Sequence, residues 1–147
     1  MWVIFDLDGT IADIEERRKI SRKANGKIDW GIFFDSKNIR LDKPVYRVIE
    51  LCSALKSAGY NIAILSGRGE ETRLATEQWL AQYGVKYDKL RMRPVQNHEP
   101  DDDLKRKWLN EDFNKKEILC TFDDRNKVVE MWRQEGLLCC QVAPGDF

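Results

Sequence analysis

The sequence lacks the residues that build a zinc site. Its 147 residues contain one histidine, His98, and four cysteines, none of which forms a CxxC pair. Structural zinc sites need four such ligands at short spacings, so none is expected here. Cys52 and Cys120 lie in apolar runs, and Cys139 and Cys140 are adjacent and cannot easily bridge each other. We interpret all four as reduced thiols.

Long hydrophobic runs and an excess of one charge are also absent. No apolar run approaches the roughly 18 residues of a membrane span, and Asp6 and Asp8 interrupt the first apolar stretch, which excludes a signal peptide. The sequence therefore predicts a soluble, cytoplasmic protein that does not contact a membrane.

The 25 basic and 25 acidic residues give a net charge of +0, so the total does not indicate a basic nucleic-acid-binding face, although charges can segregate in space. Two basic runs are interpreted as solvated surface, namely Arg17, Arg18, Arg22 and Lys23, and Arg91 with Arg93.

Strands and helices are predicted to alternate along most of the chain. Short apolar runs rich in β-formers indicate buried strands at 2–5, 61–65 and 118–122, with weaker candidates at 89–92 and 138–142. Helical apolar patterns separate them at 45–58, 72–83, 102–112 and 127–134. The alternation predicts an α/β, Rossmann-like fold with helices on both faces of one parallel sheet. The length fits a single domain, 1–147.

The stretch 13–42 breaks this alternation. It begins helical and charged, and then carries Trp30, Phe33 and Phe34. It is either a small cap over the strand ends or an ordinary insertion packed on the rim. The aromatic side chains could stack on nucleic-acid bases, but core packing is the more common use of aromatic residues in a small domain.

Every strong strand ends in residues that carry chemistry. The first ends at Asp6, the second at Ser66, and the third at Asp123 and Asp124. Ligands of parallel α/β sheets bind beyond the carboxyl ends of the strands. Because core strands need none of these residues, we expect an active site at that edge.

Asp6 and Asp8 stand two residues apart after the first strand, followed by Gly9 and Thr10. In an extended chain both carboxylates point to the same side. Like charges held so close repel unless a cation or a proton lies between them, and Mg²⁺ suits oxygen ligands. Gly9 permits the tight turn that lifts the loop off the sheet. The alternative is a polar turn with a helix N-cap.

The segment Asp6-Leu7-Asp8-Gly9-Thr10 resembles the first motif of the haloacid dehalogenase (HAD) superfamily. Three further motifs of that superfamily follow in order: a strand ending in Ser66, a lysine at Lys105 or Lys107, and the acidic pair Asp123-Asp124. The joint match spans nearly the whole chain. It implies a Mg²⁺-dependent phosphatase of the HAD fold with a small cap at most.

The resemblance implies a role for each of these residues. Asp6 attacks phosphorus and forms an aspartyl-phosphate, and Asp8 protonates the leaving oxygen and then activates water. The Mg²⁺ ligands are the Asp6 carboxylate, the Asp8 backbone carbonyl, and the pair Asp123 and Asp124, of which Asp124 is the favoured direct ligand. Ser66 and the lysine hold phosphate oxygens.

A closer resemblance is to the 3′-phosphatase domain of phage-type polynucleotide kinase-phosphatases. Five segments carry it: Ser66-Gly67-Arg68, Asp101-Asp102-Asp103-Leu104-Lys105, Asp123-Asp124-Arg125, residues 128–133 and residues 141–147. In that family a DDxxK spacing carries the catalytic lysine, which selects Lys105 over Lys107. The spacing also implies that Asp101 is an orienting acid.

The same resemblance implies further phosphate ligands, namely Arg17, Arg68, Gly67 and Thr10. From the residues alone, Arg68 could instead be a surface residue at a helix start, and Asp101 could be a helix N-cap.

The family's full form also carries a kinase domain with a phosphate loop, GxxxxGK followed by Ser or Thr, and this chain has no such loop. No ATP site is therefore expected. The predicted reaction is hydrolysis of a terminal 3′-phosphate on DNA or RNA. A 5′-nucleotidase or small-metabolite phosphatase and an inactive binding module of the same fold are the alternatives. The sequence leaves a homo-oligomer open.

Overall fold

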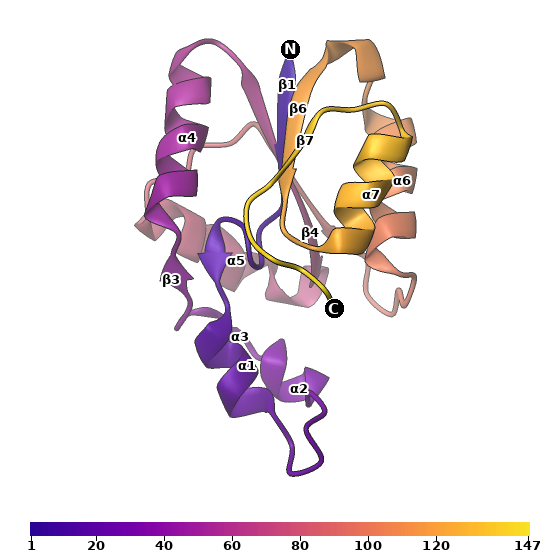
Figure 1. The fold of residues 1–147 in the computed structure, drawn as a ribbon. Coiled ribbons are helices and arrows are strands. Elements are labelled where there is room, and N and C mark those ends of the chain that lie inside the picture. Colours follow the sequence, from indigo (N-terminus) through magenta and orange to yellow (C-terminus); the bar gives the residue numbers. More distant parts are fainter.

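The computed structural model describes residues 1–147 and contains a five-stranded parallel sheet in the order β5-β4-β1-β6-β7 (Figure 1). The strands are β1 (Trp2–Phe5), β4 (Asn61–Gly69), β5 (Lys89–Arg93), β6 (Ile118–Asp123) and β7 (Cys139–Gln141). All five predicted strands are present, so the predicted parallel α/β sheet is confirmed.

Helices cover both faces of the sheet (Figure 1). The helices α4 (Tyr46–Ser57) and α5 (Arg73–Gln82) pack on one face, and α6 (Asp101–Asp112) and α7 (Asn126–Gln134) on the other. Short 3₁₀ helices, η1 (Glu70–Thr72) and η2 (Lys115–Glu117), precede α5 and β6. Strand β1 alternates between the two layers, because Val3 and Phe5 join the first core and Ile4 joins the second.

Two leucines of the predicted helices lie outside the buried faces of α4 and α5. Leu51 of α4 is 47% exposed, and Leu74 of α5 is 65% exposed. At 100° per residue Leu74 falls on the side of α5 opposite to Ala75 and Trp79, which are buried. Leu74 is therefore not part of the apolar face that packs on the sheet, while the helix predicted at 72–83 is confirmed.

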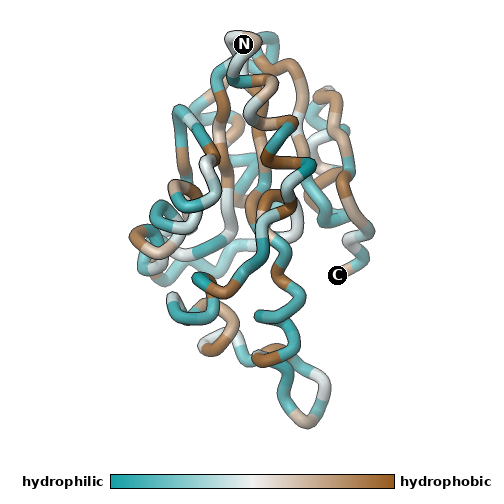
Figure 2. Tube along the Cα trace, turned by 90° about the vertical axis from the view of Figure 1, so that its left-hand side faces the viewer, coloured by the Kyte–Doolittle hydropathy of each residue, from teal (hydrophilic) through white to brown (hydrophobic).

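Residues 14–42, which we call the helical insertion, project from the carboxyl edge of the sheet (Figure 1). They contain α1 (Glu15–Ser21), α2 (Trp30–Phe33) and α3 (Ser36–Ile39), and lie between the antiparallel strands β2 (Ala12–Asp13) and β3 (Lys43–Pro44). Figure 2 shows that this part of the chain is largely hydrophilic, whereas the central strands are hydrophobic.

The aromatic residues of the helical insertion divide between core and surface. Phe33 is buried, as the core interpretation predicts, but Trp30 is 62% exposed. Core packing was therefore the wrong interpretation for Trp30.

None of the helices combines the length and the hydrophobicity that a membrane span requires.

Candidate active site

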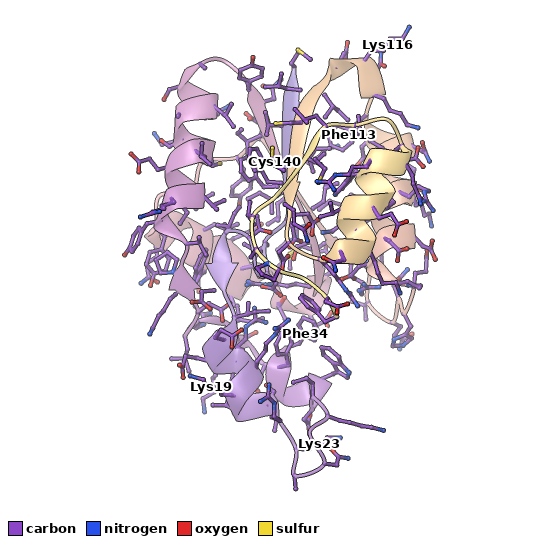
Figure 3. All side chains as sticks on the ribbon, in the orientation of Figure 1. Lys19, Lys23, Phe34, Phe113, Lys116 and Cys140 are labelled. Atoms are coloured by element: carbon purple, nitrogen blue, oxygen red, sulfur yellow. The ribbon has the colours of Figure 1, made fainter.

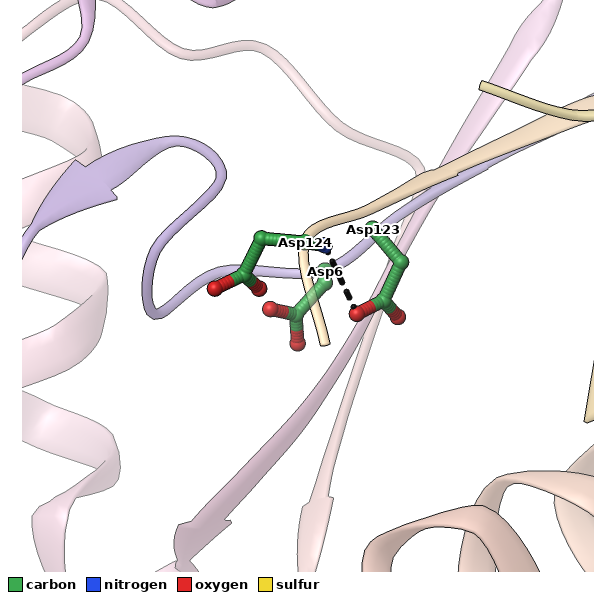
Figure 4. Close-up of side chains that lie close together, drawn as sticks. All are labelled: Asp6, Asp123 and Asp124. Carbon is green, nitrogen blue, oxygen red and sulfur yellow. Dashed lines mark hydrogen bonds between the residues drawn. The ribbon is translucent and has the colours of Figure 1, made fainter. Parts of the chain in front are cut away.

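Three carboxylates meet at the carboxyl edge of the sheet (Figure 4). Asp6 follows β1, Asp123 ends β6, and Asp124 is the next residue. All three are buried, and one oxygen of each lies within 4.8 Å of the others. Strands β1 and β6 pair directly, so the sheet register brings together residues that are more than a hundred positions apart. This convergence is what the strand-end pattern of the sequence predicts.

The loop after β1 turns sharply around Leu7. The Leu7 carbonyl accepts backbone hydrogen bonds from Thr10, Ile11 and Ala12 at 3.2, 3.0 and 2.9 Å. Gly9 has φ of +83°, and a Cβ atom at that position would lie 2.1 Å from Oδ2 of Asp124. Gly9 is therefore required both for the left-handed turn and for the close approach of the carboxylate.

Lys105 is the lysine of the site. From α6 its Nζ donates to Oδ1 of Asp6 at 2.7 Å and to Oδ2 of Asp123 at 3.0 Å, and its side chain is 3% exposed. Lys107 is exposed. Burial lowers the pKa of Lys105, but Asp123 and Asp6 outweigh this effect and raise it above its ordinary value. Lys105 is therefore positively charged, and the structure places Lys105, not Lys107, at the acidic cluster.

One lysine does not neutralise three carboxylates. Burial raises the pKa of Asp6 well above its ordinary value; Lys105 opposes this effect, and the charges of Asp123 and Asp124 add to it. Burial and the charge of Asp123 likewise raise the pKa of Asp124 to about 6. A divalent cation would relieve this repulsion, and carboxylate oxygens are the ligands that Mg²⁺ prefers. The donor set therefore fits Mg²⁺.

Asp124 has the freer carboxylate of the acidic pair. Asp123 accepts hydrogen bonds from Lys105, from the Asp124 amide at 3.0 Å and from the Trp132 indole at 3.4 Å. The Asp124 carboxylate oxygens accept only from the Thr10 hydroxyl, at 3.5 Å. A cation would compete with fewer hydrogen bonds at Asp124, which supports the choice of Asp124 as the direct ligand.

Arg17 and Arg68 form a second, basic part of the site. Both side chains are fully buried. Arg17 reaches it from α1, whereas Arg68 stands near the end of β4. The interpretation of Arg17 as solvated surface was therefore wrong, and so was the alternative that Arg68 is a surface residue at a helix start. Burying a guanidinium group is costly unless an acid compensates its charge.

Asp8 supplies part of that compensation. Its Oδ1 accepts hydrogen bonds from Nη2 of Arg17 at 2.6 Å and from Nη2 and Nε of Arg68 at 2.6 and 2.9 Å. Burial opposes ionisation of Asp8, but Arg68 and Arg17 outweigh it and lower its pKa to about 2. The Asp6 and Asp8 carboxylates therefore have different partners, namely Lys105 for Asp6 and the two arginines for Asp8. The turn at Gly9 does not continue the extended chain, and the Asp8 carboxylate is bound to arginines.

Asp42 is the second acid that compensates the charge of the buried arginines, and the sequence analysis did not identify it. Its two oxygens accept from Nε and Nη2 of Arg17 at 2.8 Å each, and from Nη2 of Arg68 at 3.0 Å. Its backbone carbonyl accepts from the Trp79 indole at 3.0 Å, which fixes the chain at the end of the helical insertion. These arginines are 25 and 26 positions away, so no local sequence pattern marks Asp42.

Replacing Asp42 by alanine is expected to lower the free energy of unfolding by ~3–5 kcal/mol, because two buried guanidinium groups lose a shared partner. Denaturant-induced unfolding measures the change. Glu16→Ala is the control, because Glu16 forms an exposed ion pair with Lys19 at 3.3 Å in the same insertion, and such pairs contribute ~1 kcal/mol or less. An equal effect of the two substitutions would contradict the stabilising role of Asp42.

The remaining predicted residues lie around these two parts. Ser66 is buried, and its Oγ accepts from the Arg68 amide at 3.2 Å. A Cβ atom on Gly67 would lie 2.7 Å from Oδ1 of Asp101. Thr10 contacts Asp6 and Asp124 at 3.5 Å, so its hydroxyl lies at the acidic cluster and not at the arginines.

Asp101 is an ion-pair partner at the first turn of α6. It accepts from Arg93 and, at 3.0 Å, from Arg125. The helix N-cap is Pro100, so the alternative that Asp101 is the N-cap was wrong. Arg93, which was interpreted as solvated surface, also donates to the Gly67 carbonyl at 3.0 Å. The ion pairs of Asp101 thus tie α6, and with it Lys105, to the loops beside it.

The parallel sheet and the acidic cluster at its carboxyl edge define a phosphatase of the HAD superfamily. The family model described as the polynucleotide kinase PNKP phosphatase domain matches residues 1–147. The chain belongs to this family.

Solved structures agree with this assignment. A chain of the Pnkp1/Rnl/Hen1 RNA repair complex is 33% identical with a TM-score of 0.82, and the match covers 99% of this chain and 43% of that chain. This chain thus spans less than half the length of that relative.

More distant structures share the fold. A predicted phosphatase from Clostridium acetobutylicum is 15% identical with a TM-score of 0.75, over 95% of this chain and 83% of that chain. CbbY from Rhodobacter sphaeroides, in complex with phosphate, is 16% identical with a TM-score of 0.66, over 99% of this chain and 86% of that chain.

Proposed function

We propose that this chain is a Mg²⁺-dependent phosphomonoesterase that forms an aspartyl-phosphate on Asp6 and removes 3′-phosphate from polynucleotide ends. The observation that carries the proposal is the environment of Asp6. Its carboxylate is buried, accepts a hydrogen bond from Lys105 at 2.7 Å, and lies within 4.8 Å of two further carboxylates at the ligand-binding edge of the sheet. A purely structural carboxylate needs no such surroundings.

In the proposed reaction Asp6 is the nucleophile and Asp8 is the general acid and base. When phosphate replaces Asp8 as the acceptor of Arg17 and Arg68, the pKa of Asp8 rises and its carboxylate takes up a proton from solvent. An Asp6 oxygen attacks phosphorus, the bond from phosphorus to the ester oxygen breaks, and Asp8 gives that proton to the ester oxygen. Asp8 then takes a proton from water, the water oxygen attacks phosphorus, and the bond from phosphorus to Asp6 breaks to release inorganic phosphate. A carboxyl group that acts as acid and then as base contributes roughly 10²–10⁴-fold.

The Asp6 carboxylate, the Asp124 carboxylate and the Asp8 backbone carbonyl would hold Mg²⁺, with Asp123 beside them. Bound there, the ion supplies positive charge for the phosphate oxygens and offsets the repulsion among the buried acids. Lys105 adds a fixed positive charge 2.7 Å from the Asp6 carboxylate and orients that carboxylate for attack.

Arg17 and Arg68 are the proposed phosphate ligands, with the loop at Ser66 and Gly67 beside them. Both guanidinium groups donate to Asp8 without substrate. A phosphate dianion would replace Asp8 as their acceptor, because bidentate guanidinium–phosphate pairs are strong. The exchange frees Asp8 for proton transfer, while Asp42 retains its bonds to both arginines. In this proposal the helical insertion acts as a small cap, since it delivers Arg17.

The family and the RNA repair complex that contains a relative support a polynucleotide end as the substrate. Among matched phosphate esters, a 3′-phosphorylated oligonucleotide is therefore expected to give a kcat/KM at least about ten-fold higher than its 5′-phosphorylated counterpart or a free nucleotide. Release of inorganic phosphate in Mg²⁺ measures the three rates.

DNA and RNA versions of each oligonucleotide are compared in the same assay, and omission of Mg²⁺ with excess chelator is the control for metal dependence. A preference for free 5′-nucleotides would replace the proposal by the nucleotidase alternative. Absence of all turnover would favour a binding module.

A further inference from the structure

The helical insertion carries an exposed aromatic cluster. Trp30 is 62% exposed and Ile32 is 43% exposed, while Phe34 is half-buried. The rings of Trp30 and Phe34 are nearly parallel, with centroids 6.0 Å apart and an interplanar angle of 20°. Removing these apolar side chains from water would be favourable. No segment of this chain covers Trp30, however. Grouped exposed apolar side chains of this kind mark interaction surfaces.

Direct contacts connect this cluster to the phosphate-binding arginines. Arg17, which donates to Asp8 at 2.6 Å, also donates to the Phe33 carbonyl at 3.2 Å and lies over the Phe33 ring at 4.5 Å. The Phe33 ring in turn packs edge-on against Phe34 at 5.0 Å and Trp30 at 5.5 Å. Phe33 therefore connects Arg17 to the rings of Trp30 and Phe34, since it contacts all three.

The helical insertion is net basic, with eight basic and five acidic residues. Five exposed basic residues of the insertion form no ion pair, namely Arg22, Lys23, Lys27, Lys37 and Arg40. The nearby acids Asp29 and Asp35 accept backbone amides at the starts of α2 and α3. Figure 3 places Phe34 on the part of the insertion nearest the sheet and Lys23 at its far tip. Lys23 thus lies farther from the sheet than Phe34.

We propose that the aromatic cluster is a stacking platform for the bases next to the 3′-phosphate of a single-stranded polynucleotide, with the unpaired basic residues along its backbone. Stacking on aromatic rings beside a positively charged track is how proteins bind single strands without reading sequence. The inference rests on the proposed function, since the strand enters by its 3′-phosphate. It assigns to the insertion a binding surface in addition to Arg17.

Trp30→Ala is expected to lower kcat/KM for a 3′-phosphorylated single strand about five-fold or more relative to kcat/KM for an aryl phosphate, which has no base to stack. Trp30→Phe is expected to retain most of the ratio. Leu138→Ala is the matched control. Leu138 is 65% exposed and precedes β7, at the opposite edge of the sheet, so its substitution should leave the ratio unchanged. An unchanged ratio in Trp30→Ala would overturn the inference, including the case in which both rates fall together.

A binding measurement separates this inference from the proposed reaction. Fluorescence polarisation with a labelled single strand that ends in a 3′-hydroxyl requires no catalysis. Wild-type protein is expected to bind it, and Trp30→Ala to bind it about five-fold more weakly. Binding that depends on Trp30 without 3′-phosphatase activity would support the platform and refute the proposed reaction. 3′-Phosphatase activity together with binding that does not depend on Trp30 would support the proposed reaction and refute the platform.

Discussion

Asp6→Asn is expected to reduce kcat for an aryl phosphate in Mg²⁺ by roughly 10⁴-fold or more, because an amide oxygen is too weak a nucleophile to form the covalent intermediate. The substitution is nearly isosteric, and the amide oxygen can still accept the hydrogen bond that Lys105 donates to Oδ1 at 2.7 Å. It also removes one of the three buried carboxylates that repel one another at this edge of the sheet. The variant should therefore stay folded and still bind inorganic phosphate.

Two measurements keep this result interpretable. Thermal unfolding tests whether Asp6→Asn is folded, and competition by phosphate for a fluorescent ligand tests whether the pocket persists. Asp13→Asn is the control, since Asp13 is an exposed aspartate in the neighbouring strand β2. Near-normal turnover by Asp6→Asn would refute the nucleophile assignment and with it the proposed mechanism.

Lys105→Met is expected to reduce kcat by about 10³-fold and to lower the free energy of unfolding by ~3–5 kcal/mol in the absence of divalent cations. The methionine leaves the buried carboxylates of Asp6 and Asp123 without the ammonium group that lies 2.7 and 3.0 Å from them. Unfolding in denaturant, with and without Mg²⁺, measures the second effect. Mg²⁺ should restore part of the lost stability, because it supplies positive charge to the same carboxylates.

Lys107→Met is the matched control, two residues further along α6 and exposed to solvent. It is expected to change the free energy of unfolding by ~0.5 kcal/mol or less. If Lys105→Met were as stable as Lys107→Met without Mg²⁺, the buried charge balance described for the acidic cluster would be wrong. Loss of turnover without loss of stability would leave Lys105 a phosphate ligand only.

Much of the fold follows from local patterns. The apolar strand segments and the helical stripes each depend on residues within one element, so periodicity places β1, β4 and β6 and the four large helices correctly. The acidic cluster follows as well. Parallel strands end at one edge, so Asp6 and Asp123 had to be neighbours once β1 and β6 paired.

Local sequence patterns predict less of the basic part of the site, which contains Arg17 and Arg68. The family resemblance singles out Arg17 and Arg68, but local sequence gives no reason for both guanidinium groups to be fully buried. That burial depends on Asp8 and Asp42, which come from different loops. The sequence likewise does not anticipate that the Asp8 carboxylate binds the arginines, since extended-chain geometry does not include the turn at Gly9.

The sequence by itself determined the layer architecture and the edge at which the chemistry lies, because strand and helix periodicity and the termination of strands are properties of consecutive residues. Only the tertiary structure decided that Asp42 holds the two arginines and that Trp30 faces solvent while Phe33 is buried. Those outcomes depend on which distant segment packs against each side chain. The partner that compensates a buried charge and the atoms that cover a side chain come from distant segments of the chain. Residue spacing within one segment therefore cannot predict either of them.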